Sequence, residues 1–328
     1  MKTLSDLGER KAIKLIENIL TKGDNILDIG DDCAALDFEK QYLLVTTDMI
    51  SQKTHIPKEM TPFQIGWFIV SINLSDIAAK GGKPLGVVLS YGLQKKTSAK
   101  YLKELTRGAN TCATTFKTNI IGGDTKETSE ITICGTAFGI VNKDEFIPRK
   151  GAKTDDLIAV TGSLGKAGAG YYCLKNNILN KNISKALLEP FPKLKEGQLL
   201  AQQKCATSCM DLSDGLSSSL YQLSEINDVG FEINYEKIPI SSSLLKLKKK
   251  NTKLNVSDFV LHFGGDYELL LTIPPNFFPK IKNILEKNDC NLYSIGKVTK
   301  DKHVKINLGN NVEILENKGY EHFKKQLF

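Results

Sequence analysis

The sequence predicts an α/β protein of two domains, and three observations support this fold class. The chain has 328 residues, more than a single hydrophobic core comfortably serves. Short apolar runs typical of strands alternate along it with longer segments of helical periodicity. A loop rich in charge, glycine and proline, NKDEFIPRKGAKTDD at 142–156, interrupts this alternation. We therefore expect one domain over residues 1–148 and a second over residues 149–328.

The first domain is expected to open with an amphipathic helix within residues 1–20. Its apolar positions share one side, and the acidic residues among them argue against a signal peptide. A strand follows at YLLVTT (42–47). The next helix has Thr61 as its N-cap, Pro62 at its first helical position and Gly81 as its terminator.

The rest of the first domain is expected to alternate in the same way. The strand LGVVLSYGL, a helix near 97–115, the strand NIIGG and the alternating run ITICGTAFGIV complete it. Because LGVVLSYGL and ITICGTAFGIV stay apolar on both faces, they predict strands covered on two sides, as in a homodimer. The second domain begins with the strand LIAVTG (157–162) and the small-residue stretch SLGKAGAGYY, and strand–helix alternation continues to KGYEHF.

Composition indicates a cytoplasmic protein that does not enter a membrane. Hydrophobic residues make up 41% of the chain and charged residues 25%, which is ordinary for a folded soluble protein. The longest apolar segment, FQIGWFIVSINLSDIAA, is broken by polar residues. The seven cysteines form no CxxC pair, so we expect free thiols in a reducing compartment and no zinc site.

The charge balance favours a small anionic substrate over nucleic acid. The formal charge is +7, but arginine occurs only at Arg10, Arg107 and Arg149. Nucleic-acid readers usually depend on arginine forks and aromatic stacking. Lysines spread along the chain suit a polyanionic small molecule equally well.

Aspartates recur in short turn-like motifs. Asp31 and Asp32 stand together after Gly30, where two like charges between apolar neighbours need compensation. A lysine, a metal ion or the solvent of a water-filled turn could supply it. Six further aspartates lie in the motifs VTTD, NLSDIAAKGG, IIGGDT, MDLSDGL and FGGDYELL, and they are Asp48, Asp76, Asp124, Asp211, Asp214 and Asp266. Most of them stand where an apolar strand gives way to Gly, Ser or Thr.

Any one of these aspartates is most simply a turn residue or a helix cap. Ser213, for example, could cap a helix that begins near Leu216. That interpretation does not explain the recurrence at strand ends, where open α/β sheets bind ligands. Carboxylates with hydroxyl neighbours such as Thr46, Thr47 and Ser75 are hard oxygen ligands that suit Mg²⁺.

Common phosphate-binding and hydrolase motifs are absent. TGSLGKAGAG does not match a P-loop, because Ala167 follows Gly165-Lys166, and it contains no GxGxxG. Neither a GxSxG elbow nor an HExxH helix occurs in the chain.

Taken in order, the motifs resemble the thiamine-monophosphate kinase family, in the superfamily of aminoimidazole-ribonucleotide synthetase. The resemblance runs from LGERKAIKLI through IGDDCAAL, TTDM, NLSDIAAKGGKP, IIGGDT, RKGAK, LIAVTGSLG, MDLSDGL and GGDYELL to KGYEHF. It implies a two-domain PurM-like fold, with a mixed sheet in the N-terminal domain that forms a strand-mediated dimer. It also implies phosphoryl transfer from ATP to thiamine monophosphate with several Mg²⁺ ions.

The resemblance assigns roles to residues. Metal contacts fall on Asp32, with Asp31 beside it, and on Thr46, Thr47, Asp48, Asp76, Asp124, Asp211 and Asp214. Nucleotide contacts fall on Gly123, Asp124, Arg149 and Ser213, and His55 approaches the acceptor. The nucleophile would be a phosphate oxygen whose second pKa of about 6 leaves it largely ionised, so no general base is required.

Two departures from the family pattern concern the acceptor. Gly265 stands where the family usually has an acceptor-contacting Glu, and Asn317 replaces a Trp that usually precedes KGY. Phe263 or Tyr320 could supply a replacement ring for the acceptor.

The sequence leaves other functions open. One is a related ATP-dependent enzyme with another phosphorylated acceptor. Selenophosphate synthetases carry a reactive Cys or selenocysteine near the N-terminus, but no Cys precedes Cys33 here. The hydrogenase-maturation relatives end in a cysteine, but this chain ends in QLF. The others are a metal-dependent phosphohydrolase and a non-catalytic nucleotide-binding protein.

Overall fold

The computed structural model describes residues 3–21 and 30–324 of the chain. The helices are α1 (Leu4–Leu7), α2 (Glu9–Glu17), α3 (Pro62–Ala79), α4 (Ala99–Thr115), α5 (Lys166–Lys175), α6 (Lys181–Leu188), α7 (Leu194–Gln202), α8 (Leu216–Asn227), α9 (Ser242–Lys250), α10 (Val256–Leu261) and α11 (Phe278–Glu286), with a 3₁₀ turn η1 (Tyr235–Lys237). The strands are β1 (Ala34–Phe38), β2 (Gln41–Ser51), β3 (Lys83–Leu93), β4 (Ile120–Glu127), β5 (Thr132–Asn142), β6 (Leu157–Val160), β7 (Ser208–Asp211), β8 (Gly230–Asn234), β9 (Leu269–Ile273), β10 (Tyr293–Thr299), β11 (Val304–Asn307) and β12 (Val312–Ile314). The expected α/β class is confirmed.

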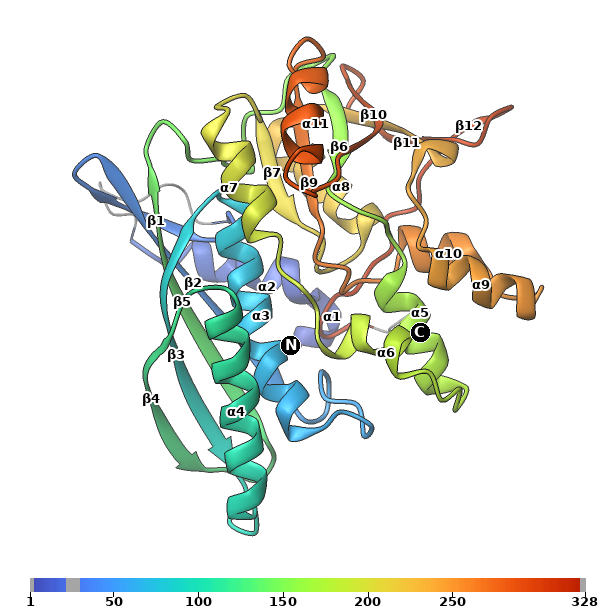
Figure 1. The fold of residues 1–328 in the computed structure, drawn as a ribbon. Helices are drawn as coiled ribbons and strands as arrows, with labels where there is room; N and C mark the ends of the chain where they lie inside the picture. Colours follow the sequence, from blue (N-terminus) through green and yellow to red (C-terminus); the bar gives the residue numbers. More distant parts are fainter. Residues whose placement is uncertain (1–2, 22–29, 325–328) are drawn as a thin grey trace.

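The first half of the chain forms a mixed five-stranded sheet in the order β1-β2-β5-β3-β4. Its pairs are antiparallel except β3 with β4. Helices α3 and α4 cover one face, and the opposite face carries no helix of the described chain (Figure 1). On that open face the side chain of Met49 is 63% exposed.

The second half forms a seven-stranded sheet in the order β12-β11-β8-β10-β6-β9-β7. The expected strand at LIAVTG is confirmed as β6, which lies between β10 and β9. A short loop over residues 212–215, which carries Ser213 and Asp214, connects β7 to helix α8.

Helix α3 joins the two halves. Its predicted start is confirmed, because Thr61 is the N-cap, its side chain accepts a hydrogen bond from the Gln64 amide, and Pro62 is the first helical residue. The helix is apolar on nearly all sides, as expected of a helix with no solvated face. It packs on β2, β3 and β5 of the first sheet and on α7 and β7 of the second half. Asp76 and Lys80 at its C-terminal end therefore lie between the halves.

Three local expectations are wrong. The N-terminal helix is broken into α1 and α2 at Gly8, whose φ of 80° interrupts the helix. Ser213 does not cap α8, because Gly215 occupies the N-cap position. Asp48 and Asp124 lie inside β2 and β4 and not at strand ends, since pairing continues past both residues.

No helix among the described residues is long and apolar enough to cross a membrane.

Candidate active site

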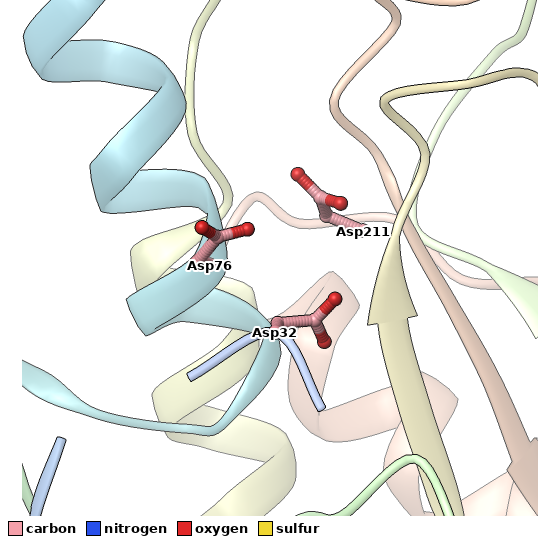
Figure 2. A group of neighbouring side chains, drawn as sticks. All are labelled: Asp32, Asp76 and Asp211. Carbon is pink, nitrogen blue, oxygen red and sulfur yellow. The ribbon is translucent and has the colours of Figure 1, made fainter. Parts of the chain in front are cut away.

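Three carboxylates from separate parts of the chain converge between the two halves. Asp32 comes from the turn before β1, Asp76 from α3 and Asp211 from the end of β7. One oxygen of each lies within 4.8 Å of the others, and Figure 2 shows the three side chains turned toward a common space. The sequence-predicted ligands Asp32, Asp76 and Asp211 are therefore brought together by the fold.

Neighbouring hydroxyls hold two of these carboxylates in place. The Thr46 hydroxyl on β2 donates to Asp76 Oδ2 over 2.6 Å. The Ser75 hydroxyl on α3 donates to Asp211 Oδ2 over 2.6 Å. Each bond fixes one oxygen of its carboxylate and leaves the other oxygen available to a ligand.

The cluster is electrostatically unfavourable when its members are ionised. Burial, followed by the charges of its neighbours, raises the pKa of Asp211 to about 7 and that of Asp48 to about 6. The same causes raise the pKa of Asp76 well above its ordinary value. Burial and the charge of Glu9 raise the pKa of Asp214 to about 6. Carboxylates held together this way favour a cation.

The positive partner expected for Asp31 and Asp32 is Lys80. Its ammonium nitrogen lies 2.5 Å from Asp31 Oδ1 and 2.9 Å from Asp32 Oδ2, and donates to the Cys209 carbonyl over 2.8 Å. The Lys80 side chain is 0% exposed. The sequence and its family resemblance led us to expect a metal ion facing Asp31 and Asp32, whereas the structure places the ammonium of a lysine against both carboxylates.

Arg149 completes this ion-pair group. Its guanidinium pairs with Asp32 Oδ1, and its backbone amide donates to Asp31 Oδ2 over 2.8 Å. Burial alone would raise the pKa of Asp32, but Arg149 and Lys80 outweigh it and hold that pKa below its ordinary value. Asp32 Oδ2 accepts no hydrogen bond of good geometry from a described residue, and its contact is the Lys80 ion pair.

Sequence reasoning missed Lys80, although a signal was present. Asp76 and Lys80 are four residues apart and so lie on the same face of α3. A lysine on an otherwise apolar helix, one turn after a candidate ligand, indicates a buried ion pair.

The predicted acceptor residue His55 lies in an aromatic group next to Asp214. Its ring centre is 5.0 Å from that of His322 and 6.4 Å from that of Tyr320. Burial, followed by the charge of His322, lowers the pKa of His55 to about 4. The Tyr320 amide donates to the Asp214 carbonyl over 3.1 Å, which places the C-terminal segment beside the carboxylates.

The other predicted acceptor residues are more dispersed. The Gly265 amide donates to the Ser213 carbonyl over 2.8 Å, so this glycine borders the carboxylate loop. Phe263 lies between Tyr171 and Phe259, with ring centres 5.1 and 5.9 Å away. Asn317 is exposed in the segment after β12.

Three predicted residues lie outside the cluster in the single chain. Thr47 alternates with Thr46 along β2 and so points to the open face of the sheet. Asp124 is on the edge strand β4, exposed and paired with Lys126. Gly123 is needed for packing, because a Cβ there would lie 1.9 Å from the Leu89 carbonyl oxygen.

Asp266 has a structural role. Its carboxylate accepts hydrogen bonds from the amides of Gly165, over 2.5 Å, and Ala167, over 2.9 Å, at the start of α5. It is a helix cap, the simple interpretation of a turn aspartate.

Two family models match the chain. Residues 30–141 match the N-terminal domain of AIR synthase related proteins, and residues 153–309 match the C-terminal domain. The thiamine-monophosphate kinase of Buchnera aphidicola subsp. Acyrthosiphon pisum is 34% identical, with 92% of this chain and 93% of the relative covered. That of Methanocaldococcus jannaschii is also 34% identical, with 90% and 94% covered.

Solved structures share the fold over nearly the whole chain. AaThiL complexed with AMPPCP and TMP superposes with a TM-score of 0.87 at 28% identity, covering 98% of this chain and 99% of that one. The thiamine-monophosphate kinase of Stenotrophomonas maltophilia K279a gives a TM-score of 0.75 at 28% identity, covering 90% and 95%. The HypE–HypF complex gives 0.76 at only 18% identity, which shows a common fold and nothing finer.

Proposed function

Because this chain belongs to the AIR synthase related family, and within it to the thiamine-monophosphate kinases, we propose that its carboxylate cluster serves phosphoryl transfer from ATP to thiamine monophosphate. The reaction is an ATP-dependent phosphorylation that gives thiamine diphosphate. The observation that carries this function is the agreement in sequence and fold with kinases of that name over more than nine-tenths of the chain.

We propose that the cluster binds Mg²⁺. Asp32, Asp76 and Asp211 offer converging oxygens, which is the hard donor set that Mg²⁺ prefers. Lys80 and Arg149 pair with Asp31 and Asp32, but burial and neighbouring negative charges still raise the pKa values of Asp76 and Asp211, which supports binding of a further cation. Bound Mg²⁺ would neutralise the phosphates and stabilise the transferring group. The charge of Asp48 raises the pKa of both Asp76 and Asp211, and the charge of Asp214 raises that of Asp48, so we add these two residues to the proposed set.

The remaining predicted roles stay proposals of the same kind. Arg149 borders the cluster and is proposed to contact the nucleotide, together with Ser213 and Gly123. Thr47 and Asp124 are proposed metal-proximal residues only by family resemblance, since the single chain holds them apart from the carboxylates.

On the acceptor side, the geometry supports the group of His55, Tyr320 and His322. His55 remains neutral at pH 7, because its pKa is lowered to about 4. A neutral imidazole and a phenol ring can stack on the acceptor rings without repelling a thiazolium cation. Gly265 and Asn317, which replace the usual Glu and Trp, leave this group as the proposed substitute.

We propose that the protein is a homodimer formed by the open face of the first sheet. Exposed apolar side chains lie along its strands, at Met49 on β2, Leu85 on β3 and Ile121 on β4. Contiguous exposed apolar surface commonly marks an interface. Light scattering at micromolar concentration should give about twice the chain mass of 36.3 kDa. A measured mass equal to that of one chain would contradict the proposed homodimer.

The proposed domains are residues 1–148 and 149–328, on either side of the loop that separates the two sheets. All seven cysteines are free thiols, which supports the proposal of a reducing, cytoplasmic environment.

One assay tests the function and its rivals together. The purified protein is incubated with Mg·ATP and a panel of phosphorylated acceptors, with ADP and phosphorylated product both measured. Thiamine diphosphate formed in equal amount to ADP is the expected result. ADP formed without any acceptor would indicate a phosphohydrolase, and turnover of a different acceptor would keep only the kinase class.

A further inference from the structure

Asn73 is a buried polar residue of helix α3 to which the proposed function assigns no role. Its side chain belongs to a residue that is 0% exposed. It stands three residues before Asp76 and seven before Lys80, so the three side chains share one face of α3. This face therefore carries an uncharged amide beside the proposed metal ligand and the buried lysine.

Strand β5 shows where the Asn73 side chain lies relative to the first sheet. A Cβ at Gly135, in the middle of β5, would lie 2.6 Å from Asn73 Nδ2, so the glycine leaves the room that this amide occupies. Gly135 pairs with Asp48 on β2, and residues directly opposite each other in an antiparallel pair project to the same face. The side chain of Asp48 therefore projects from the sheet toward α3, on the side where Asn73 lies.

The bond between Thr46 and Asp76 supports this placement. Thr46 lies two residues before Asp48 on β2 and so projects to the same face of the sheet. Its hydroxyl donates to Asp76 Oδ2 on α3, which shows that this face of β2 meets the polar face of the helix. Asn73 is thus flanked by Asp48 across the sheet and by Asp76 along the helix.

The amide of Asn73 has a partner at one end only. Its Nδ2 donates to the Ile69 carbonyl over 2.9 Å, so the oxygen is the other branch of the amide and is turned away from that carbonyl. Asn73 Oδ1 is buried and has no hydrogen-bond partner among the described residues. A buried acceptor without a donor is costly, and native proteins rarely keep one. The unpaired oxygen therefore indicates a donor that arrives with a ligand.

The chemistry of the neighbouring groups indicates that this donor is water bound to a cation. The Thr46 hydroxyl already donates to Asp76, ionised carboxylates have no hydrogen to donate, and the phosphate oxygens of a nucleotide are themselves acceptors. Mg²⁺ in proteins usually keeps several of its waters, and their hydrogens are available as donors. Polar groups around the direct ligands of a metal orient the site and tune its affinity.

We propose that Asn73 is a positioning residue for Mg²⁺, and that its Oδ1 accepts a hydrogen bond from a water on an ion held by Asp48 and Asp76. The inference rests on the proposed magnesium site and adds an uncharged residue to it. The contact orients the hydrated ion between β2 and α3 and involves no proton transfer. The amide oxygen is then satisfied only when the ion is bound.

The test measures Mg²⁺ affinity and metal-free stability in Asn73→Leu, which keeps the branching of the side chain and removes both polar atoms. The affinity is measured by calorimetry with Mg²⁺ alone, on the full chain after treatment with a chelator, and the stability by thermal denaturation without metal. Affinity should fall about 10-fold, the effect expected for a residue that supports a metal from outside its direct ligands. The metal-free melting midpoint should not fall, because the variant removes an acceptor that had no donor. Asn73→Ala, which also lacks the amide, should weaken Mg²⁺ binding to the same extent.

The matched control is Thr118→Val, which also removes a buried and unpaired oxygen. Thr118 is 3% exposed, and its hydroxyl has no partner within the part of the chain that the structure describes. It lies in the turn before β4, which β5 and β3 separate from β2. The variant should therefore leave both Mg²⁺ affinity and stability unchanged.

Unchanged Mg²⁺ affinity in both Asn73 variants would overturn the proposal, and so would a wild-type protein that binds no Mg²⁺. Asn73→Leu clearly less stable than Thr118→Val without metal would make the amide a structural group and overturn it as well. Complete loss of Mg²⁺ binding would make Asn73 a direct ligand and overturn the contact through water. If the wild type binds Mg²⁺ but phosphorylates no acceptor, the proposed function fails, and the same affinities still decide the role of Asn73.

Discussion

Replacing Lys80 by methionine should destabilise the protein by an amount that the structure allows us to work out. Methionine keeps most of the apolar stem and removes the ammonium group that contacts Asp31, Asp32 and the Cys209 carbonyl. Breaking a buried ion pair by removing one partner costs about 3–5 kcal/mol. Asp32 would keep Arg149, and Asp31 would keep the Arg149 amide and is 14% exposed, so we expect the lower end, about 3 kcal/mol.

Thermal and urea denaturation of the metal-free protein measure this loss. At about 2 °C per kcal/mol for a chain of this size, the melting midpoint should fall by about 6 °C. Mg²⁺ should restore part of the difference, because a divalent cation supplies the missing positive charge. The matched control is Lys204→Met, which removes an exposed ion pair with Asp144 and should have little measurable effect. A Lys80→Met protein no less stable than this control would refute the argument.

Three further predictions concern the carboxylates and the acceptor. Asp48→Asn and Asp124→Asn should each lower turnover by orders of magnitude without unfolding the protein. If either variant keeps near wild-type activity at limiting Mg²⁺, the replaced aspartate is not a metal ligand. The melting midpoint of the metal-free protein should fall as the pH rises from about 4 to 7, because folded carboxylates such as Asp211, with a pKa of about 7, hold protons that the unfolded chain releases at lower pH. This fall should be absent at saturating Mg²⁺, and a midpoint that rises over the same range would contradict it. Phe263→Ala and Tyr320→Ala distinguish the two candidate rings. Loss of the ring that holds the acceptor should raise KM for thiamine monophosphate more than KM for ATP. Tyr320 lies in the His55 group and is expected to show that difference; equal effects on both substrates would leave either ring as a packing residue.

The parts of the fold that follow from local rules could be predicted from the sequence. Helix α3 begins where Thr61 and Pro62 indicate, since capping depends on residues within one turn. Asp76 and Asp211 were recognised as candidate ligands because each stands beside a hydroxyl in a recurrent motif. Their meeting point depends on how α3 packs against β7, and only the family resemblance indicated it.

The errors arose where distant segments decide the outcome. Asp48 looked like the end of a strand, but pairing with β5 carries β2 on to Ser51. Lys80 lies 48 positions beyond Asp32 in the sequence; the local pattern on α3 indicates a buried ion pair, but tertiary packing decides that Asp32 is the partner. Thr47 was grouped with Thr46, although alternation along a strand sends the two side chains to opposite faces.

The position of α3 between the halves has a consequence for protein synthesis. Asp32 and Asp76 leave the ribosome long before Asp211, and at translation rates of about 5–20 residues per second the delay is on the order of ten seconds. During that interval the nascent chain holds two of the three clustered carboxylates and an apolar helix without its final cover. The proposed metal site is therefore complete only when the second half folds against α3 and brings Asp211 to the other two carboxylates.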